Sequence, residues 1–170
     1  MRLGLGILGI LILLGGSGCA GYRLGPSNGQ VAGERTIQIS PFENRTLEPR
    51  LGDALTSALR KEIQRDGTFQ LTTRAGGDYV ISGAITHYER GEVSFLPVDV
   101  VTARDYKVSF TAHIVARERI TGTVIMDRDL TGSTLMRVGT DLPSVERQAL
   151  PLLAADLARQ ITAALADGTW

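Results

Sequence analysis

Few side chains in this sequence belong to the types that carry out catalysis or hold a metal ion. The chain has one cysteine, Cys19, and two histidines, His87 and His113. Both histidines lie in segments that predict strands, where a histidine usually has a structural or surface role. Asp127 and Asp129 are two residues apart and share one strand face, the usual arrangement of solvated acids. A hydrolase would need a pocket in which one of these histidines lies beside an acid, and the sequence has no motif that predicts one. We therefore expect a non-enzymatic protein without a metal or cofactor.

The sequence around Cys19 predicts lipid attachment. A basic start precedes residues 3–14, which carry no charge and are too few to span a bilayer as a permanent helix. This is the layout of a secretory signal, and its end in small residues before Cys19 is similar to a bacterial lipoprotein processing site. Gly16 departs from that pattern, which usually has a branched apolar residue there. We expect residues 1–18 to be a signal peptide and Cys19 to be the lipidated first residue of the mature chain, carrying acyl groups such as palmitate.

The alternative for Cys19 is a plain secreted protein with an unpaired thiol, which is a liability in an oxidising compartment. Beyond it, residues 19–35 are rich in glycine and predict a flexible tether. Residues 36–170 are enough for one domain. The 18 basic and 18 acidic residues balance, so no strong field favours nucleic acid. Membrane attachment is expected only through the lipid, because no later apolar stretch is long enough to span.

Hydrophobic periodicity predicts the secondary structure. Alternation of apolar and polar residues predicts strands at 36–42, 69–72, 78–88 and 106–117, and a turn at 120–123 leads into another strand. Helical spacing predicts a helix from Pro49 to the Asp66-Gly67 stop, and a second one over 143–166. The fold class predicted is α+β, with two amphipathic helices packed on one face of an open, mostly antiparallel or mixed sheet.

The last predicted helix contains Pro151, which predicts either a kink or a helix that begins near this residue. Its apolar stripe is expected to face the core. The stripe consists of Val145, Ala149, Leu152, Leu153, Leu157, Ile161 and Leu165.

The connection between residues 88 and 106 is unusually apolar. It contains Val93, Phe95, Leu96, Pro97, Val98, Val100 and Val101. Because connections normally run over the surface and are polar, this segment needs a partner. One interpretation is that it continues the flanking strands and is half-buried. The other is a loop that docks another protein through Phe95, Leu96, Pro97 and Val98.

Basic residues gather on the predicted strands. Lys107, Arg117 and Arg119 lie on or near the polar face of one strand, and Arg128 and Arg137 follow across the hairpin. Spaced cations on one sheet face can bind anionic phosphates. The alternative is a solvated strand face, because acidic residues are interleaved with these cations.

With these elements placed, the mature chain resembles the lipopolysaccharide-assembly lipoprotein family LptE. The resemblance is carried by the runs CAGYRL at 19–24, IQISPFENRT at 37–46 and DYVISG at 78–83, and by the C-terminal amphipathic helix. It implies two helices on a four-stranded sheet, anchored by lipid on the periplasmic side of the outer membrane. It also implies a partner, the large β-barrel translocon LptD, whose lumen the lipoprotein plugs and whose assembly it assists.

The family also binds lipopolysaccharide through basic residues. The candidates for that role come from strand geometry and are Lys107, Arg117, Arg119 and Arg128. The alternative function is a periplasmic lipoprotein adaptor or regulator of a cell-wall enzyme or another envelope complex. That alternative predicts normal surface lipopolysaccharide when the protein is depleted.

Overall fold

The computed structural model describes residues 31–96, 99–137 and 141–168. The expected signal peptide and Cys19 lie outside this part of the chain. The elements, in chain order, are β1 (Thr36–Ile39), β2 (Glu43–Asn44), α2 (Leu51–Asp66), β3 (Gln70–Thr72), β4 (Tyr79–Leu96), β5 (Asp99–Glu118), β6 (Val124–Arg137) and α3 (Leu142–Asp167). The last residues of the expected tether, 31–35, contact this fold, because the Gly33 N–H donates to the Thr68 carbonyl at 2.9 Å.

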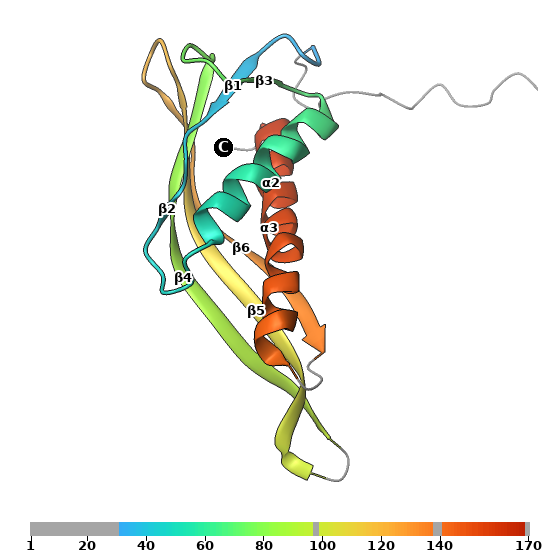
Figure 1. Ribbon diagram of the computed structural model, residues 1–170. Coiled ribbons are helices and arrows are strands. Elements are labelled where there is room, and N and C mark those ends of the chain that lie inside the picture. The colour runs from blue at the N-terminus through green and yellow to red at the C-terminus, as the bar shows by residue number, and fades with distance from the viewer. Residues whose placement is uncertain (1–30, 97–98, 138–140, 169–170) are drawn as a thin grey trace, which may run out of the picture.

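The described strands form one mixed, six-stranded sheet in the order β3-β1-β4-β5-β6, with β2 added to β4. The three short strands pair in parallel, whereas β4, β5 and β6 form an antiparallel meander. Both helices pack on the same face of this sheet, and no described element covers the opposite face (Figure 1). The predicted fold class is therefore confirmed. The sheet has more strands than the resemblance implied, because the short strands at its edge also pair.

The core lies between the helices and the covered face of the sheet. Alternate residues of β5, from Val108 to Ala116, are buried against the helices, as the alternation predicts. The helix α2 contributes Leu55, Leu59 and Ile63, which are fully buried. It ends at Gly67, whose left-handed backbone, with φ 76°, favours glycine.

The helix α3 runs through Pro151 without a break in its assignment. It begins at Leu142, capped by Asp141, so the alternative that it starts near Pro151 is wrong. The expected position of Leu152 is also wrong, because this side chain is 62% exposed. The next residue, Leu153, is fully buried. Successive side chains on a helix point about 100° apart, so Leu152 points away from the buried face of α3.

By length and composition, α3 is the one described helix that resembles a membrane span, with a mean hydropathy of 1.2, so the expectation that no later apolar stretch is long enough is wrong. Half of its apolar window is buried inside the fold. This is the pattern of a core helix.

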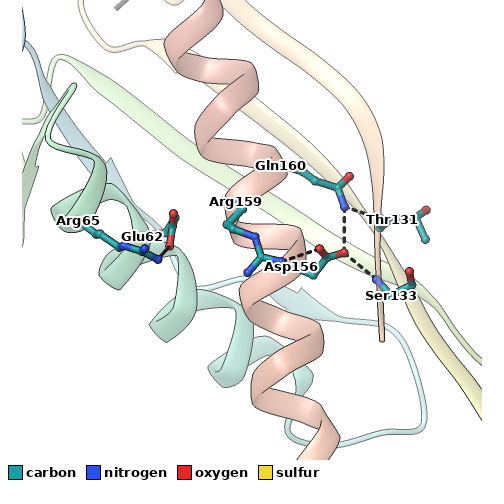
Figure 2. Close-up of polar contacts among 7 residues, drawn as sticks. All are labelled: Glu62, Arg65, Thr131, Ser133, Asp156, Arg159 and Gln160. Carbon is teal, nitrogen blue, oxygen red and sulfur yellow. Dashed lines mark hydrogen bonds and ion pairs between the residues drawn. The ribbon is translucent and has the colours of Figure 1, made fainter. Parts of the chain in front are cut away.

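The helix α3 also covers part of the edge strand β6. The Asp156 Oδ2 accepts a hydrogen bond from the Ser133 backbone N–H at 3.0 Å, and the Gln160 Nε2 donates to the Thr131 carbonyl at 3.0 Å (Figure 2). These contacts occupy two backbone groups of an edge strand that would otherwise be open to pairing with another chain.

The apolar connection between residues 88 and 106 is mostly strand. The strand β4 continues to Leu96 and β5 starts at Asp99, with register shifts between Glu92 and Leu96. The interpretation that the segment extends the flanking strands is therefore confirmed for the backbone. The result is a long β4–β5 hairpin that projects beyond the start of α3 (Figure 1). Pro97 and Val98, expected in a docking loop, lie outside the described residues.

Candidate interaction surface

The uncovered face of the sheet contains two of the four expected phosphate-binding cations. On β5, Lys107 lies between Gly91 of β4 and Leu135 of β6. Arg117 is on the same face of the same strand, but ten positions further along. At the rise of a strand this places the two residues on the order of 30 Å apart. The face therefore presents one of these cations at each end.

The other two expected cations are placed differently. Arg119 follows β5, and its Nε donates to the Gly77 carbonyl at 3.1 Å, which ties the end of β5 to the start of β4. Arg128 is paired in register with Ile114, a fully buried residue, so Arg128 lies on the helix side of the sheet. The idea that all four cations share one sheet face is therefore wrong, and a role in lipid binding stays a prediction for each of them.

The centre of the uncovered face is polar. The His113 Nδ1 lies 2.9 Å from Asp129, and its Nε2 lies 3.2 Å from Asp127. The Thr111 and Thr131 hydroxyls are hydrogen bonded at 2.7 Å on the same face. Among the described residues no group of three or more His, Cys, Asp or Glu side chains has a geometry that could hold a metal ion. His113 is thus a strand histidine with surface acid partners.

The hairpin end of the uncovered face combines exposed apolar side chains with Lys107 and with an ion pair between Arg137 and Asp105. Val93 is 56% exposed and Leu135 is 69% exposed, and both line a hollow of about 350 Å³. Arg137 borders the same hollow and its Nε donates to Asp105 at 2.8 Å. We call Val93, Lys107, Leu135 and Arg137 the hairpin-end patch. Exposed aliphatic side chains beside cations suit a partner that is both apolar and anionic.

Leu135 was not among the residues expected to lie at a surface site. Its position follows from the alternation along β6, in which Met126 and Leu130 face the core, so odd-numbered residues face the other way. Continuing that alternation to the end of the strand would have placed Leu135 on the uncovered face.

Opposite this patch, on the helix side, polar contacts hold the hairpin to α3. The Tyr88 hydroxyl donates to Glu146, and Arg90 Nη1 lies 3.4 Å from the same carboxylate. The Arg90 guanidinium also lies 5.8 Å from the centre of the Tyr106 ring. Burial, and then the hydrogen bond to Glu146, raise the pKa of Tyr88. The first turns of α3 thus support the base of the projecting hairpin.

Comparison with known proteins identifies a family and a fold. The family model LptE, described as lipopolysaccharide-assembly, matches residues 34–165. No curated protein sequence matches the chain significantly.

Several solved structures have the same fold. A hypothetical protein from Chlamydia trachomatis has a TM-score of 0.57 at 11% identity, over 79% of this chain and 96% of its own. A Xanthomonas campestris protein has a TM-score of 0.55 at 12% identity, over 87% and 90%. The uncharacterized lipoprotein B from Nitrosomonas europaea has a TM-score of 0.53 at 12% identity, over 86% and 90%. At these identities the likeness shows the fold alone.

Proposed function

We propose that the chain is an outer-membrane lipoprotein subunit of the lipopolysaccharide transport machinery. The proposal follows from its family, because the chain belongs to the LptE family of lipopolysaccharide-assembly proteins. In this role it binds the LptD β-barrel, plugs its lumen, assists its assembly and contacts lipopolysaccharide. The family is non-enzymatic, and we propose the same of this chain. The match to the family model over residues 34–165 is the observation that carries the proposal.

Membrane attachment in this proposal occurs through the lipid on Cys19. The tether between Cys19 and Val31, the first described residue, would let the domain reach a partner embedded in the same membrane. The domain itself then supplies the specificity for that partner.

The hairpin-end patch is the proposed contact surface for the barrel and for lipopolysaccharide. The backbone of β4 carries Phe95 and Leu96 to the tip of the hairpin, just after the exposed Val93 and past the end of β6. Apolar residues there suit a protein wall, and Lys107 suits the phosphates of the lipid A part of lipopolysaccharide. Arg117 lies at the far end of the face, away from the hairpin tip, and is the weaker candidate for this reason.

Copurification tests the proposal. A C-terminally tagged full chain, extracted gently with an uncharged detergent, should bring down a large outer-membrane β-barrel. The matched control is the chain that starts after Cys19 and is secreted behind an ordinary cleavable signal peptide, which should lack the lipid anchor and recover less barrel. If the wild-type chain recovers no barrel under conditions that preserve other envelope complexes, the proposed partner is wrong.

A further inference from the structure

A second concave surface lies on the helix layer, on the other side of the molecule from the uncovered sheet face. It is a groove of about 420 Å³ between α2 and α3. The groove is open because several residues that line it have short side chains, notably Ala58 on α2 and Pro151 and Ala155 on α3. Its volume is within the range of small-ligand sites.

The charges of this groove are segregated along its length. On α2 the lining begins with Ala54 and ends with Arg65, and on α3 it begins with Pro151 and ends with Arg159. The two helices run in the same general direction (Figure 1). The uncharged start of the lining on α2 therefore lies toward the uncharged start on α3, and the two charged ends lie toward each other. The groove therefore has an apolar end and a charged end, rather than charges distributed along both rims.

The charged end is cationic. Lys61, Arg65 and Arg159 line it together with one acid, Glu62, whose carboxylate lies 3.9 Å from Arg65. A second acid, Asp156, pairs with Arg159 at 2.8 Å. Its other oxygen accepts from the β6 backbone, so Asp156 is held on the sheet side of α3, away from Glu62 and Arg65 (Figure 2). Each arginine thus has an acidic partner, and the three cations exceed the two acids by one positive charge, which corresponds to Lys61.

We propose that the groove between α2 and α3 binds a single-chain anionic amphiphile, with its apolar tail beside Ala58 and Pro151 and its anionic head beside Lys61, Arg65 and Arg159. An acidic helix from a partner protein would carry charge along its whole length, which the apolar half of the groove does not match. An amphiphile has the same lengthwise division as the groove. The head group is a phosphate, as in a lipid headgroup, or a carboxylate, as in a fatty acid.

The lysines of the chain provide a direct test. There are two, Lys61 at the charged end of the groove and Lys107 on the uncovered sheet face. The full chain, held in nanodiscs of zwitterionic phosphatidylcholine, is treated with a water-soluble acetylating reagent, and acetylation of each lysine is followed by mass spectrometry. Near-saturating dodecyl phosphate should slow acetylation of Lys61 by roughly three- to tenfold and leave Lys107 unchanged.

Three further probes separate the parts of the ligand. Inorganic phosphate tests the head alone, and dodecyltrimethylammonium tests the same tail with the opposite charge; neither should protect Lys61. Laurate tests a carboxylate head. Protection by laurate equal to that by dodecyl phosphate indicates a fatty acid, and protection by dodecyl phosphate alone indicates a lipid phosphate.

Variants on α2 test the location. Arg65→Gln should weaken protection by dodecyl phosphate roughly two- to fivefold, because one cation of the head site is lost. Arg60→Gln, an exposed arginine of the same helix outside the groove, should leave it unchanged. Unchanged Lys61 acetylation, equal slowing of both lysines, or equal effects of the two variants would overturn the proposal. None of these outcomes bears on lipopolysaccharide assembly, which the copurification above tests separately.

Discussion

The Asp78 carboxylate accepts two hydrogen bonds from Thr36, one from its backbone N–H and one from its hydroxyl, each at 2.8 Å. In return the Asp78 N–H donates to the Thr36 hydroxyl at 2.9 Å. These bonds join the starts of β4 and β1, two neighbouring parallel strands. They also lower the pKa of Asp78, because they stabilise its charged form. The aspartate that opens the DYVISG run thus has a structural role.

Replacing Asp78 by Asn should therefore destabilise the domain by roughly 1–2 kcal/mol at neutral pH. The stabilisation from a lowered pKa is present above the unfolded value of about 4 and is lost as the pH falls through the folded value. The difference between wild type and Asp78→Asn in urea unfolding should accordingly shrink in acid. Asp53→Asn, at an exposed position of α2, is the control. A difference that stays constant down to pH 2 would show that this carboxylate has no pH-linked role.

Close packing between β6 and α3 makes Gly132 intolerant of a side chain. A Cβ on Gly132 would lie 2.8 Å from the Leu157 Cβ and 2.9 Å from the Leu153 carbonyl oxygen. Because the second atom belongs to the backbone of α3, the helix itself would have to move to make room. Gly132→Ala should lower the free energy of unfolding by about 1–3 kcal/mol. Gly91→Ala is the matched control, because a Cβ there meets no atom within 4 Å. Equal stability of the two variants in thermal unfolding would mean that α3 does not lie this close to β6.

The contact between Tyr88 and Glu146 predicts sensitivity to alkali. A raised tyrosine pKa contributes stability below the unfolded value of about 10, and this stability is lost as the pH rises through the folded value. Tyr88→Phe should cost roughly 1–2 kcal/mol at neutral pH, and the cost should diminish above pH 10. Tyr106→Phe retains the Tyr88–Glu146 bond and serves as the control. Equal alkaline unfolding profiles for wild type and Tyr88→Phe would contradict the prediction.

Lipopolysaccharide should contact Lys107 more strongly than Arg117, because Lys107 lies in the hairpin-end patch. In low salt, Lys107→Glu should weaken binding of purified lipopolysaccharide more than Arg117→Glu, and the double variant should weaken it most. Arg60→Glu with Arg74→Glu makes the same change of net charge on exposed residues elsewhere. Unchanged binding by the double variant removes this face from the lipid site.

The hairpin tip is expected to contact the barrel. Phe95→Asp should lower the yield of the copurified complex without changing the thermal unfolding of the free protein. Ile120→Asp is the matched control, because Ile120 is 79% exposed in the turn at the opposite end of β5. Equal yields for both variants would exclude the tip from the interface.

The sequence was most informative where a pattern has a single structural explanation. The period-2 alternation of β5 predicts which of its residues are buried, and Gly67 predicts the end of α2, because both follow from local backbone geometry. The long β4–β5 hairpin was ambiguous, because apolar crowding suits an extended strand and a docking loop equally.

Pairing across strands explains the errors in the candidate site. Arg128 has the same parity as Met126 and Leu130 on β6, so alternation places it on the helix side, whereas nearness in sequence alone groups it with the other cations. The contact of Arg119 with Gly77 joins residues 42 positions apart. A contact of that kind depends on tertiary structure and has no local sequence signal.

The most direct test of the proposed function is the amount of lipopolysaccharide at the cell surface after depletion of this protein, measured by labelling intact cells. If the chain acts in lipopolysaccharide assembly, surface lipopolysaccharide should fall while newly made lipopolysaccharide accumulates inside the cell, and the wild-type gene should restore it. Normal surface lipopolysaccharide in fully depleted cells would contradict the account, and is the result expected of an adaptor or regulator of another envelope complex.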